Sequence, residues 1–518
     1  MSERQDPLGD EGLTRAAARD VATVAKGGAI QIVGQVTQRG LSFFFTALAI
    51  HLMGRAAYGV YRVVAQVLAI AAQLALAGFN YATMRFITKA RAAGDPGGVR
   101  GAAKVGIVGA LIGSAIVVAG ILLGADALAG RFPDVGEGRS ELAALFRLTA
   151  PYIPLFGLLQ VLRYCTQAYK TMVPSVVAGN VVQPGIRFVV GVALLLAGFQ
   201  VVAALVTLMV SVAIAAAVAG WYFVKMLTPD ERAAAPVAPV GPMVRFALPQ
   251  GGASLLGVQS LGLGILVLGA YSGDVAVTLF AAALSLQEPG TVFLGGIVNI
   301  WAPVVSDLHE KGEIGRLESL YQTINRWIAT FSFPVFAALI IVPDLFIGSF
   351  FPKAAGGATA VAILAAGNLF YTGTGPTGYV LSMTGRPGVN LANSAAGVAL
   401  YLALGAVLVP RHGVVGMAIV DASVTALVNS ARVIEAKILV GVQPFGRSFF
   451  KPVVATLAGA ALLLAWRAIP GDALWLDWTG VAVASLLYFF VLKRLGVDPE
   501  ERMVLDRIKK RAFKGRSR

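Results

Sequence analysis

The sequence predicts an all-α membrane protein with about fourteen transmembrane helices, arranged as two six-helix lobes followed by two C-terminal helices. Three observations support this fold class. Of the 518 residues, 57% are hydrophobic and only 13% are charged, whereas a soluble domain carries roughly a quarter charged residues. Apolar runs of about 20 residues, long enough to cross a bilayer as a helix, recur from end to end. No segment keeps the period-two alternation, over about ten residues, of a transmembrane β-strand.

The predicted spans are apolar segments separated by glycine, proline and charged residues. Each is long enough to cross the hydrocarbon layer of a bilayer as a helix. In chain order they cover residues 27–52, 57–80, 102–124, 145–168, 173–197, 199–224, 246–271, 275–304, 323–348, 358–382, 389–409, 413–439, 452–469 and 475–493.

An internal repeat divides these spans into two lobes. Residues 27–40 read GGAIQIVGQVTQRG and residues 251–264 read GGASLLGVQSLGLG. Both contain GGA, five residues, Gln, four residues and Gly, at the starts of the first and seventh spans. A duplicated six-helix unit would place the motif at these two points. The predicted domains are a cytoplasmic N-terminal tail (1–26), an N-lobe (27–225), a cytoplasmic Pro/Ala-rich linker (226–244), a C-lobe (245–440), a final helix pair (441–493) and a basic cytoplasmic tail (494–518).

The distribution of charge predicts the orientation. Placing both termini in the cytoplasm puts most of the 42 Lys and Arg residues in or beside cytoplasmic segments, as the positive-inside rule requires. The longest outer loop, 125–143, is then acidic overall. Because the net charge of +15 comes from short loops and the tail KKRAFKGRSR, it indicates contact with anionic lipid rather than with nucleic acid.

The sequence offers no metal site, cofactor site or catalytic set. Cys165 is the only cysteine, which excludes an internal disulfide or a thiolate cluster. The three histidines, His51, His309 and His412, are isolated from one another. No Ser/His/Asp set or phosphate-binding glycine loop stands out. We therefore predict no enzyme activity and no catalytic residue.

Polar residues form stripes along several spans. Each helical residue advances by about 100°, so residues three, four and seven apart share a face. The members of the first stripe fall within roughly 80° of one another, and those of the second within roughly 40°. The stripes are Gln31, Gln35, Arg39, Ser42 and Thr46 in the first span, Arg62, Gln66, Gln73 and Asn80 in the second, Asn180, Gln183 and Arg187 in the fifth, and Asp421, Thr425, Asn429 and Arg432 in the twelfth.

These stripes predict a shared hydrated cavity. A charge that faces lipid at mid-depth costs at least about 2.5–3.5 kcal/mol, so the stripes must face other helices or water. A competing interpretation makes them packing contacts between neighbouring helices, and Arg187 also fits a structural pair. Glu288 and Asp421 are either salt-bridge partners of the arginines or carriers of a coupling proton. The predicted cavity residues are Gln31, Gln35, Arg39, Arg62, Gln66, Gln73, Asn180 and Arg187.

Four stretches resemble the Wzx-type polysaccharide exporters of the multidrug/oligosaccharidyl-lipid/polysaccharide (MOP) flippase superfamily. The resemblance is spread over about residues 25–440, and its motifs are individually loose but correctly ordered. The stretches are MGRAAYGVYRVVAQVLAIAAQLALAGFNYATMRFITKA, QAYKTMVPSVVAGNVVQPGIRF, WAPVVSDLHEKGEIGRLESLYQTINRW and LSMTGRPGVNLANSAAGVALYLALGAVLVPRHGVVGMAIVDASV.

The resemblance implies a V-shaped bundle in the bacterial inner membrane that translocates a lipid-linked oligosaccharide. The usual carrier in such systems is undecaprenyl pyrophosphate, and Arg39 and Arg62 best match the family's cationic lumen residues. A polysaccharide polymerase and other assembly proteins are the expected partners. The last two spans resemble the extra pair of fourteen-span relatives.

Three alternative functions remain at this point. A cation-coupled multidrug exporter of the same superfamily is disfavoured because the N-lobe spans carry arginines and no obvious acid. A membrane-embedded glycosyltransferase or polymerase is disfavoured because the longest outer loop has only about twenty residues, an ordinary connector. A flippase for the peptidoglycan precursor lipid II has nearly the same physical requirements as the first choice.

Overall fold

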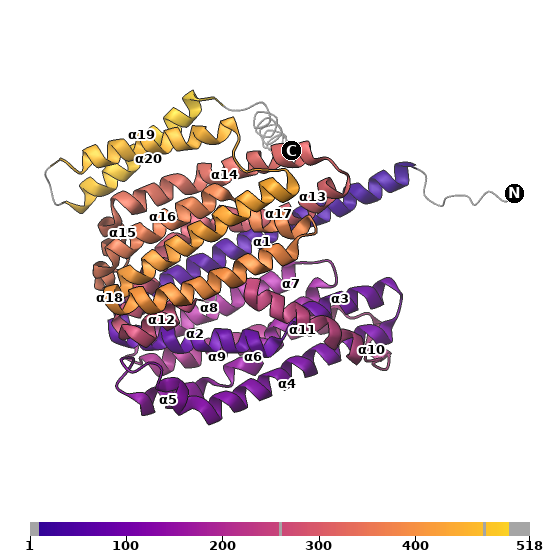
Figure 1. The fold of residues 1–518 in the computed structure, drawn as a ribbon. Coiled ribbons are helices and arrows are strands. Elements are labelled where there is room, and N and C mark those ends of the chain that lie inside the picture. Colours follow the sequence, from indigo (N-terminus) through magenta and orange to yellow (C-terminus); the bar gives the residue numbers. More distant parts are fainter. Residues whose placement is uncertain (1–9, 258–261, 470–472, 497–518) are drawn as a thin grey trace, which may run out of the picture.

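The computed structural model describes residues 10–257, 262–469 and 473–496. In these ranges every regular element is a helix (Figure 1). Eleven helical segments are long and apolar enough to cross a membrane, by length and composition. The number differs from fourteen because the segment Pro387–Val440, which consists of two helices that meet at a kink at Gly413, counts once, the span 246–271 is divided, and polar residues lower the hydropathy of the first span. The count of about fourteen therefore stays a prediction.

The first lobe contains long helices that lie side by side in the lower half of Figure 1. The first helix begins before the predicted span, because residues 10–26 are rich in good helix formers such as alanine. Its elements are α1 (Asp10–Met53), α2 (Arg55–Leu76), α3 (Phe79–Ala92), α4 (Pro96–Ala129), α5 (Arg139–Thr149), α6 (Tyr152–Gln167), α7 (Val173–Val176), the π-helix η1 (Val177–Val182), α8 (Gln183–Leu196) and α9 (Val201–Met226).

Most of the second lobe forms the upper half of Figure 1, whereas its first two helices, α11 and α12, lie beside α3 and α2 of the first lobe, and α1 runs between the two lobes. The elements are α11 (Val240–Gly257), α12 (Leu263–Tyr271), α13 (Gly273–Glu310), α14 (Ile314–Ile341), α15 (Pro343–Phe350), the 3-10 helix η2 (Pro352–Gly357), α16 (Ala358–Thr374), α17 (Thr377–Met383), α18 (Pro387–Glu435), the π-helix η3 (Ala436–Val440) and the 3-10 helix η4 (Arg447–Phe449). The element labelled α18 consists of two helices that meet at Gly413, where φ is 52°.

The last two helices, α19 (Phe450–Trp466) and α20 (Leu474–Arg494), pack on the outside of the second lobe. Gly459 allows their close approach, since a Cβ there would lie 3.1 Å from the carbonyl oxygen of Ala484. The hydroxyl of Tyr488 donates a hydrogen bond of 2.7 Å to the carbonyl of Thr330 in α14. The helix pair therefore covers one face of α14. Of the predicted basic tail, residues 494–518, the part from residue 497 onward lies outside the described residues.

The segment between the lobes is partly helical and is attached to the first lobe. Within the predicted linker 226–244, α10 (Pro229–Ala233) forms a short helix and α11 already begins at Val240. Between them, the N–H of Val237 donates to the carbonyl of Gly97 at 2.9 Å. Gly101 is needed at this contact, because a Cβ there would lie 1.8 Å from the carbonyl oxygen of Val237.

Glu231 fixes the linker through a small buried cluster. Thr228 and Glu231 form a capping box at the start of α10, the Tyr169 hydroxyl donates to Glu231 at 2.8 Å, and Arg91 pairs with it at 3.3 Å. Burial alone would raise the pKa of Glu231. The hydrogen bonds from the Thr228 backbone and Tyr169, together with the charge of Arg91, outweigh burial and hold this pKa below its usual value.

We expect this cluster to make stability depend on pH in the acid range. Because the folded-state pKa of Glu231 is below the unfolded value, its ionised form stabilises the protein above the unfolded pKa, and the stabilisation is lost as pH falls through the folded pKa. Glu231→Gln should lower the melting temperature at neutral pH by a few degrees. The difference from the wild type should shrink as the pH falls below about 4. Thermal unfolding in detergent across this pH range measures it, and a pH-independent difference would contradict the assignment.

Candidate functional site

The two lobes meet closely at the end of the bundle where α1 turns into α2. A Cβ on Gly59 of α2 would lie 2.1 Å from the carbonyl oxygen of Asp274 in α13, so the two backbones touch. Beside this contact, the Thr278 hydroxyl donates to the carbonyl of Arg55 at 2.6 Å. Phe43 of α1 packs edge-on against Phe350 and Phe351, with ring centroids 5.3 and 5.4 Å away. We call this region the outer seam, because the orientation that the sequence predicts places it on the outer side of the membrane.

Away from the outer seam, the lobes enclose a cavity of about 810 Å³. Side chains from both lobes line it, and most of them carry amide, hydroxyl or charged groups. They come from α1, η1, α13, α16, α17 and α18. The lining residues are Gln31, Gln35, Gln38, Arg39, Ser42, Asn180, Leu284, Gln287, Glu288, Thr291, Leu294, Gly295, Asn368, Tyr371, Tyr379 and Thr425.

The polar stripe of α1 forms one wall of this cavity. Four of its five members, Gln31, Gln35, Arg39 and Ser42, line the hollow. The fifth, Thr46, is buried nearer the outer seam and accepts a hydrogen bond of 3.4 Å from Tyr58. α1 is a regular helix throughout this part, so residues spaced by three and four stay on one face, as the sequence predicts.

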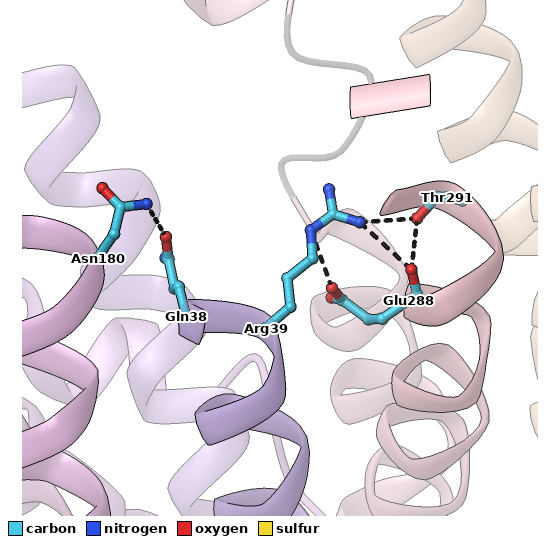
Figure 2. Close-up of polar contacts among 5 residues, drawn as sticks. All are labelled: Gln38, Arg39, Asn180, Glu288 and Thr291. Atoms are coloured by element: carbon cyan, nitrogen blue, oxygen red, sulfur yellow. Dashed lines mark hydrogen bonds and ion pairs between the residues drawn. The ribbon is translucent and has the colours of Figure 1, made fainter. Parts of the chain in front are cut away.

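Arg39 lies between the lobes and contacts α13. Its Nε is 3.5 Å from Glu288 Oε2, and its Nη1 donates to Thr291 Oγ1 at 3.0 Å and to the carbonyl of Glu288 at 3.3 Å (Figure 2). The Arg39 and Glu288 side chains are 29% and 48% exposed, so the pair faces the cavity. Glu288 therefore fits the salt-bridge interpretation of the sequence, with Arg39 as its partner.

Gln38, the residue before Arg39, contacts the first lobe. Asn180 in η1 donates to the Gln38 side-chain oxygen at 2.5 Å (Figure 2). Behind Asn180, Arg163 of α6 donates to Asn180 Oδ1 at 3.1 Å and to the carbonyl of Ser175 at 3.2 Å. A Cβ on Gly179 would lie 2.3 Å from Arg163 Cζ, so a larger residue here would displace the guanidinium. Among its hydrogen-bond partners in the described residues, Arg163 has no carboxylate.

Sequence reasoning missed Arg163 and several lining residues of the second lobe. Arg163 sits in the span segment LLQVLRYCTQ, where an intramembrane arginine is the same signal that Arg39 gives. Gln287 and Thr291 flank Glu288 by one and three residues, a spacing that a stripe search in α13 detects. Tyr371 and Tyr379 gave no distinguishing signal, because tyrosines are common in membrane helices.

The predicted residues Asn180 and Arg187 do not share a face of the structure. The π-helix η1 has a wider turn than an α-helix, which rotates α8 relative to the residues before it. Arg187 instead donates to the Tyr61 hydroxyl at 2.6 Å and lies 4.4 Å from the Phe45 ring centroid. Its place is therefore in the interior of the first lobe, outside the cavity lining.

The polar stripe of α2 also lies outside the cavity lining. Gln66 is buried, and a Cβ on Gly262 would lie 2.4 Å from its side-chain carbon. Arg62 and Gln73 are partly buried and do not line the hollow. Gln66 therefore meets Gly262, the residue before α12 of the other lobe, rather than open space. Asn80, the last member of the predicted stripe, lies on α3, beyond the turn at Gly78.

Asp421 forms a separate polar pair inside the second lobe. The Tyr401 hydroxyl donates to Asp421 Oδ2 at 3.0 Å, and both residues belong to α18, on opposite sides of the turn at Gly413. A Cβ on Gly264 of α12 would lie 2.7 Å from the same hydroxyl oxygen. One turn further along, Thr425 reaches the cavity. Arginine is not among the hydrogen-bond or ion-pair partners of Asp421 within the described residues.

Metal and redox chemistry find no support in the described part of the chain. It contains no group of three His, Cys, Asp or Glu side chains that could hold a metal ion. Cys165 is free and fully buried. The cavity can instead bind an anion through Arg39 and accept hydroxyl-rich groups through its amides and tyrosines.

Comparison with known proteins adds a family and a fold. Residues 24–309 match the family model described as polysaccharide biosynthesis protein. No curated protein sequence matches the chain. Among solved structures, the lipid II flippase MurJ in an inward closed conformation has a TM-score of 0.73 and 10% sequence identity, covering 89% of this chain and 97% of that chain.

Multidrug resistance transporters of the MATE family share the same fold. An inward-facing structure has a TM-score of 0.65 and 17% identity, covering 78% of this chain and 94% of that chain. An outward-facing structure has a TM-score of 0.57 and 17% identity, covering 81% of this chain and 95% of that chain. These matches confirm the resemblance seen in the sequence: the chain belongs to the polysaccharide biosynthesis protein family and has the transporter fold of the MOP superfamily.

Proposed function

We propose that the protein is a flippase that moves a lipid-linked oligosaccharide from the cytoplasmic to the outer leaflet of the bacterial inner membrane, for surface polysaccharide biosynthesis. The cargo is an oligosaccharide repeat unit on a carrier of the undecaprenyl pyrophosphate type. The observation that carries the proposal is the 810 Å³ cavity between the lobes, lined by amides and hydroxyls around Arg39 and bounded at one end by the outer seam. The family match to polysaccharide biosynthesis proteins supports the cargo class.

The side chains of the cavity suit the two parts of such a headgroup. A guanidinium binds diphosphate oxygens through paired, charge-assisted hydrogen bonds and stays charged when partly buried. The sugar hydroxyls can pair with glutamine and asparagine side chains, among them Gln31, Gln35 and Asn368. The lipid tail needs no polar partner and stays in the bilayer while the headgroup crosses.

The proposed orientation places the end of the cavity that lies away from the outer seam towards the cytoplasm. The end of the molecule opposite the outer seam carries Lys89 and Arg91 at the end of α3 and Lys225 at the end of α9, as the positive-inside rule predicts for a cytoplasmic face. Both chain termini then lie in the cytoplasm. Rocking of the two lobes would close this side and open the outer seam.

The membrane potential can supply the energy for export. Moving about two negative charges outward across roughly 100 mV, inside negative, releases about 4–5 kcal/mol. Asp421 remains a second source of coupling, since a carboxyl group inside the lobe can bind a proton in one state and release it in the other. A dependence of transport on pH at fixed potential would separate these two sources.

The experiment is a flipping assay with protein reconstituted in liposomes. A fluorescent pyrophosphoryl polyprenyl oligosaccharide is placed in both leaflets, and an impermeant quencher reports the fraction accessible from outside. We expect the protein to make the inner-leaflet pool accessible, and a potassium diffusion potential to bias the final distribution by about 10³-fold for two charges at 100 mV. Efflux of cationic dyes without any movement of the glycolipid would instead establish a multidrug exporter.

A flippase for lipid II is the second candidate. The structural likeness to MurJ favours it, with a TM-score of 0.73 over 97% of that chain, and its cargo carries the same pyrophosphate group. The same liposomes, loaded with fluorescent lipid II, decide between the two. Transport of lipid II at a higher rate than of oligosaccharide pyrophosphate lipids would favour this candidate.

A further inference from the structure

Two adjacent residues tie α1 to opposite lobes of the molecule. Gln38 accepts a hydrogen bond from Asn180 of the first lobe, and Arg39 contacts Glu288 and Thr291 of the second (Figure 2). Neighbouring residues on a helix point about 100° apart, so one turn of α1 can reach both walls of the cavity. Any relative movement of the lobes must lengthen or break one of these two contacts.

The contact with the second lobe is the one that can be exchanged. The Arg39–Glu288 ion pair is a contact of 3.5 Å between partly exposed side chains in the cavity, and such pairs contribute little to stability. Two hydrogen bonds from Arg39 Nη1, to Thr291 Oγ1 and to the Glu288 carbonyl, complete the contact. By contrast, Asn180 is buried, and Arg163 holds it through a further hydrogen bond. An anion that enters the cavity therefore meets an Arg39 whose carboxylate partner is loosely held.

Glu288 also determines which anions can bind to Arg39 in the cavity. With its carboxylate beside Arg39, this part of the cavity has no net charge, and a monovalent anion gains little by displacing it. A diphosphate brings about two charges and several acceptor oxygens, and it can form the paired hydrogen bonds that the single carboxylate contact does not. Arg39 Nη2 makes no hydrogen bond within the described residues, so it is available to a second acceptor.

We propose that Glu288 is an internal competitor for the anionic headgroup, and that its displacement from Arg39 releases α1 from α13. This inference rests on the proposed function and adds a mechanism by which cargo binding starts the movement of the lobes. The unloaded protein keeps α1 attached to both lobes. A pyrophosphoryl headgroup takes the place of the Glu288 carboxylate and draws the guanidinium away from Thr291 and the Glu288 carbonyl. The contact of Arg39 with the second lobe is then lost, and α1 stays with the first lobe through Gln38.

A cysteine pair can report this release without touching the cavity. Ile32 of α1 and Gly296 of α13 are in contact, since a Cβ on Gly296 would lie 3.1 Å from Ile32 Cγ1. Neither residue lines the cavity. The double substitution Ile32→Cys, Gly296→Cys should form a disulfide rapidly under mild oxidation while α1 is attached. Cys165 is fully buried and can be left in place.

The test compares the rate of disulfide formation with and without farnesyl pyrophosphate, which carries the pyrophosphate group on a short isoprenoid tail. In the otherwise unchanged protein, we expect farnesyl pyrophosphate to slow disulfide formation about fivefold, and farnesol to have no effect. With Glu288→Gln added, formation should already be slow and the ligand should change it little. Glu313→Gln, which removes a carboxylate from a surface pair with Arg316, is the matched control and should behave like the unchanged protein.

The outcomes separate this inference from the proposed function. Binding of farnesyl pyrophosphate, measured by calorimetry, with equal disulfide rates in all variants would overturn the competitor role and leave the flippase proposal in place. Slow formation in the Glu313→Gln variant as well would also overturn it, because the effect would then follow overall charge. If farnesyl pyrophosphate and longer pyrophosphoryl lipids bind to no variant, both proposals are wrong.

Discussion

Replacing Arg39 with alanine should reduce transport of a pyrophosphoryl lipid about 100-fold and leave the protein folded in the membrane. The loss follows from two or more charge-assisted hydrogen bonds to the headgroup, each contributing about 1.5–3 kcal/mol. Folding should be little affected, because the ion pair of Arg39 with Glu288 is half-exposed and such pairs contribute about 0–1 kcal/mol. The flipping assay in liposomes gives the rate, and gel filtration with thermal unfolding gives the fold.

Two matched variants define what the result means. Arg39→Lys keeps the charge but loses the planar pair of donors, so we expect an intermediate rate. Arg316→Ala removes a guanidinium from a surface pair outside the cavity and should transport like the unchanged protein. Normal transport by Arg39→Ala would remove this residue from the mechanism, and an equal loss in Arg316→Ala would indicate a general effect of charge.

Helical periodicity predicted the wall of the cavity where the helix is regular. Gln31, Gln35, Arg39 and Ser42 lie on one face of α1, and that face is the one that lines the hollow. The positions of the membrane helices could be predicted for the same reason, since hydrophobic length depends on the local sequence alone. The break between spans 389–409 and 413–439 is an example, because the backbone leaves the helical conformation at Gly413 and two helices meet there.

The structure differs from the prediction where contacts with another segment determine where a polar side chain lies. The sequence does not say that Gln66 of α2 packs against Gly262 of the other lobe, nor that the chain turns at Gly78 and places Asn80 on α3. Arg187 lies outside the cavity lining because η1 interrupts the α-helical period. No residue type in the sequence predicts such a π-helical turn. Asp421 pairs with Tyr401 across a turn, a contact that only the folded α18 creates.

A larger residue at position 59 should force the outer seam open. The backbones of α2 and α13 touch at Gly59, where a Cβ would lie 2.1 Å from the carbonyl oxygen of Asp274 and 2.7 Å from its Cα. Backbone atoms cannot move aside as a flexible side chain can, so Gly59→Val must separate the two helices. Overpacking of this kind costs about 1–3 kcal/mol, which shifts an equilibrium between two states by about 5- to 150-fold.

The shift should be visible as access to the cavity from the outer side. A cysteine introduced by Ser42→Cys lies in the cavity just inside the outer seam, and an impermeant thiol reagent added outside should label it only when the seam opens. Labelling should rise about fivefold or more with Gly59→Val, and transport should fall, because a protein held in one state cannot complete its cycle. Gly120→Val on α4, where a Cβ meets no atom within 4 Å, is the matched control and should change neither quantity. If Gly59→Val transports normally with the cysteine still protected, the seam is not the outer gate, and the cargo must leave the cavity by another route.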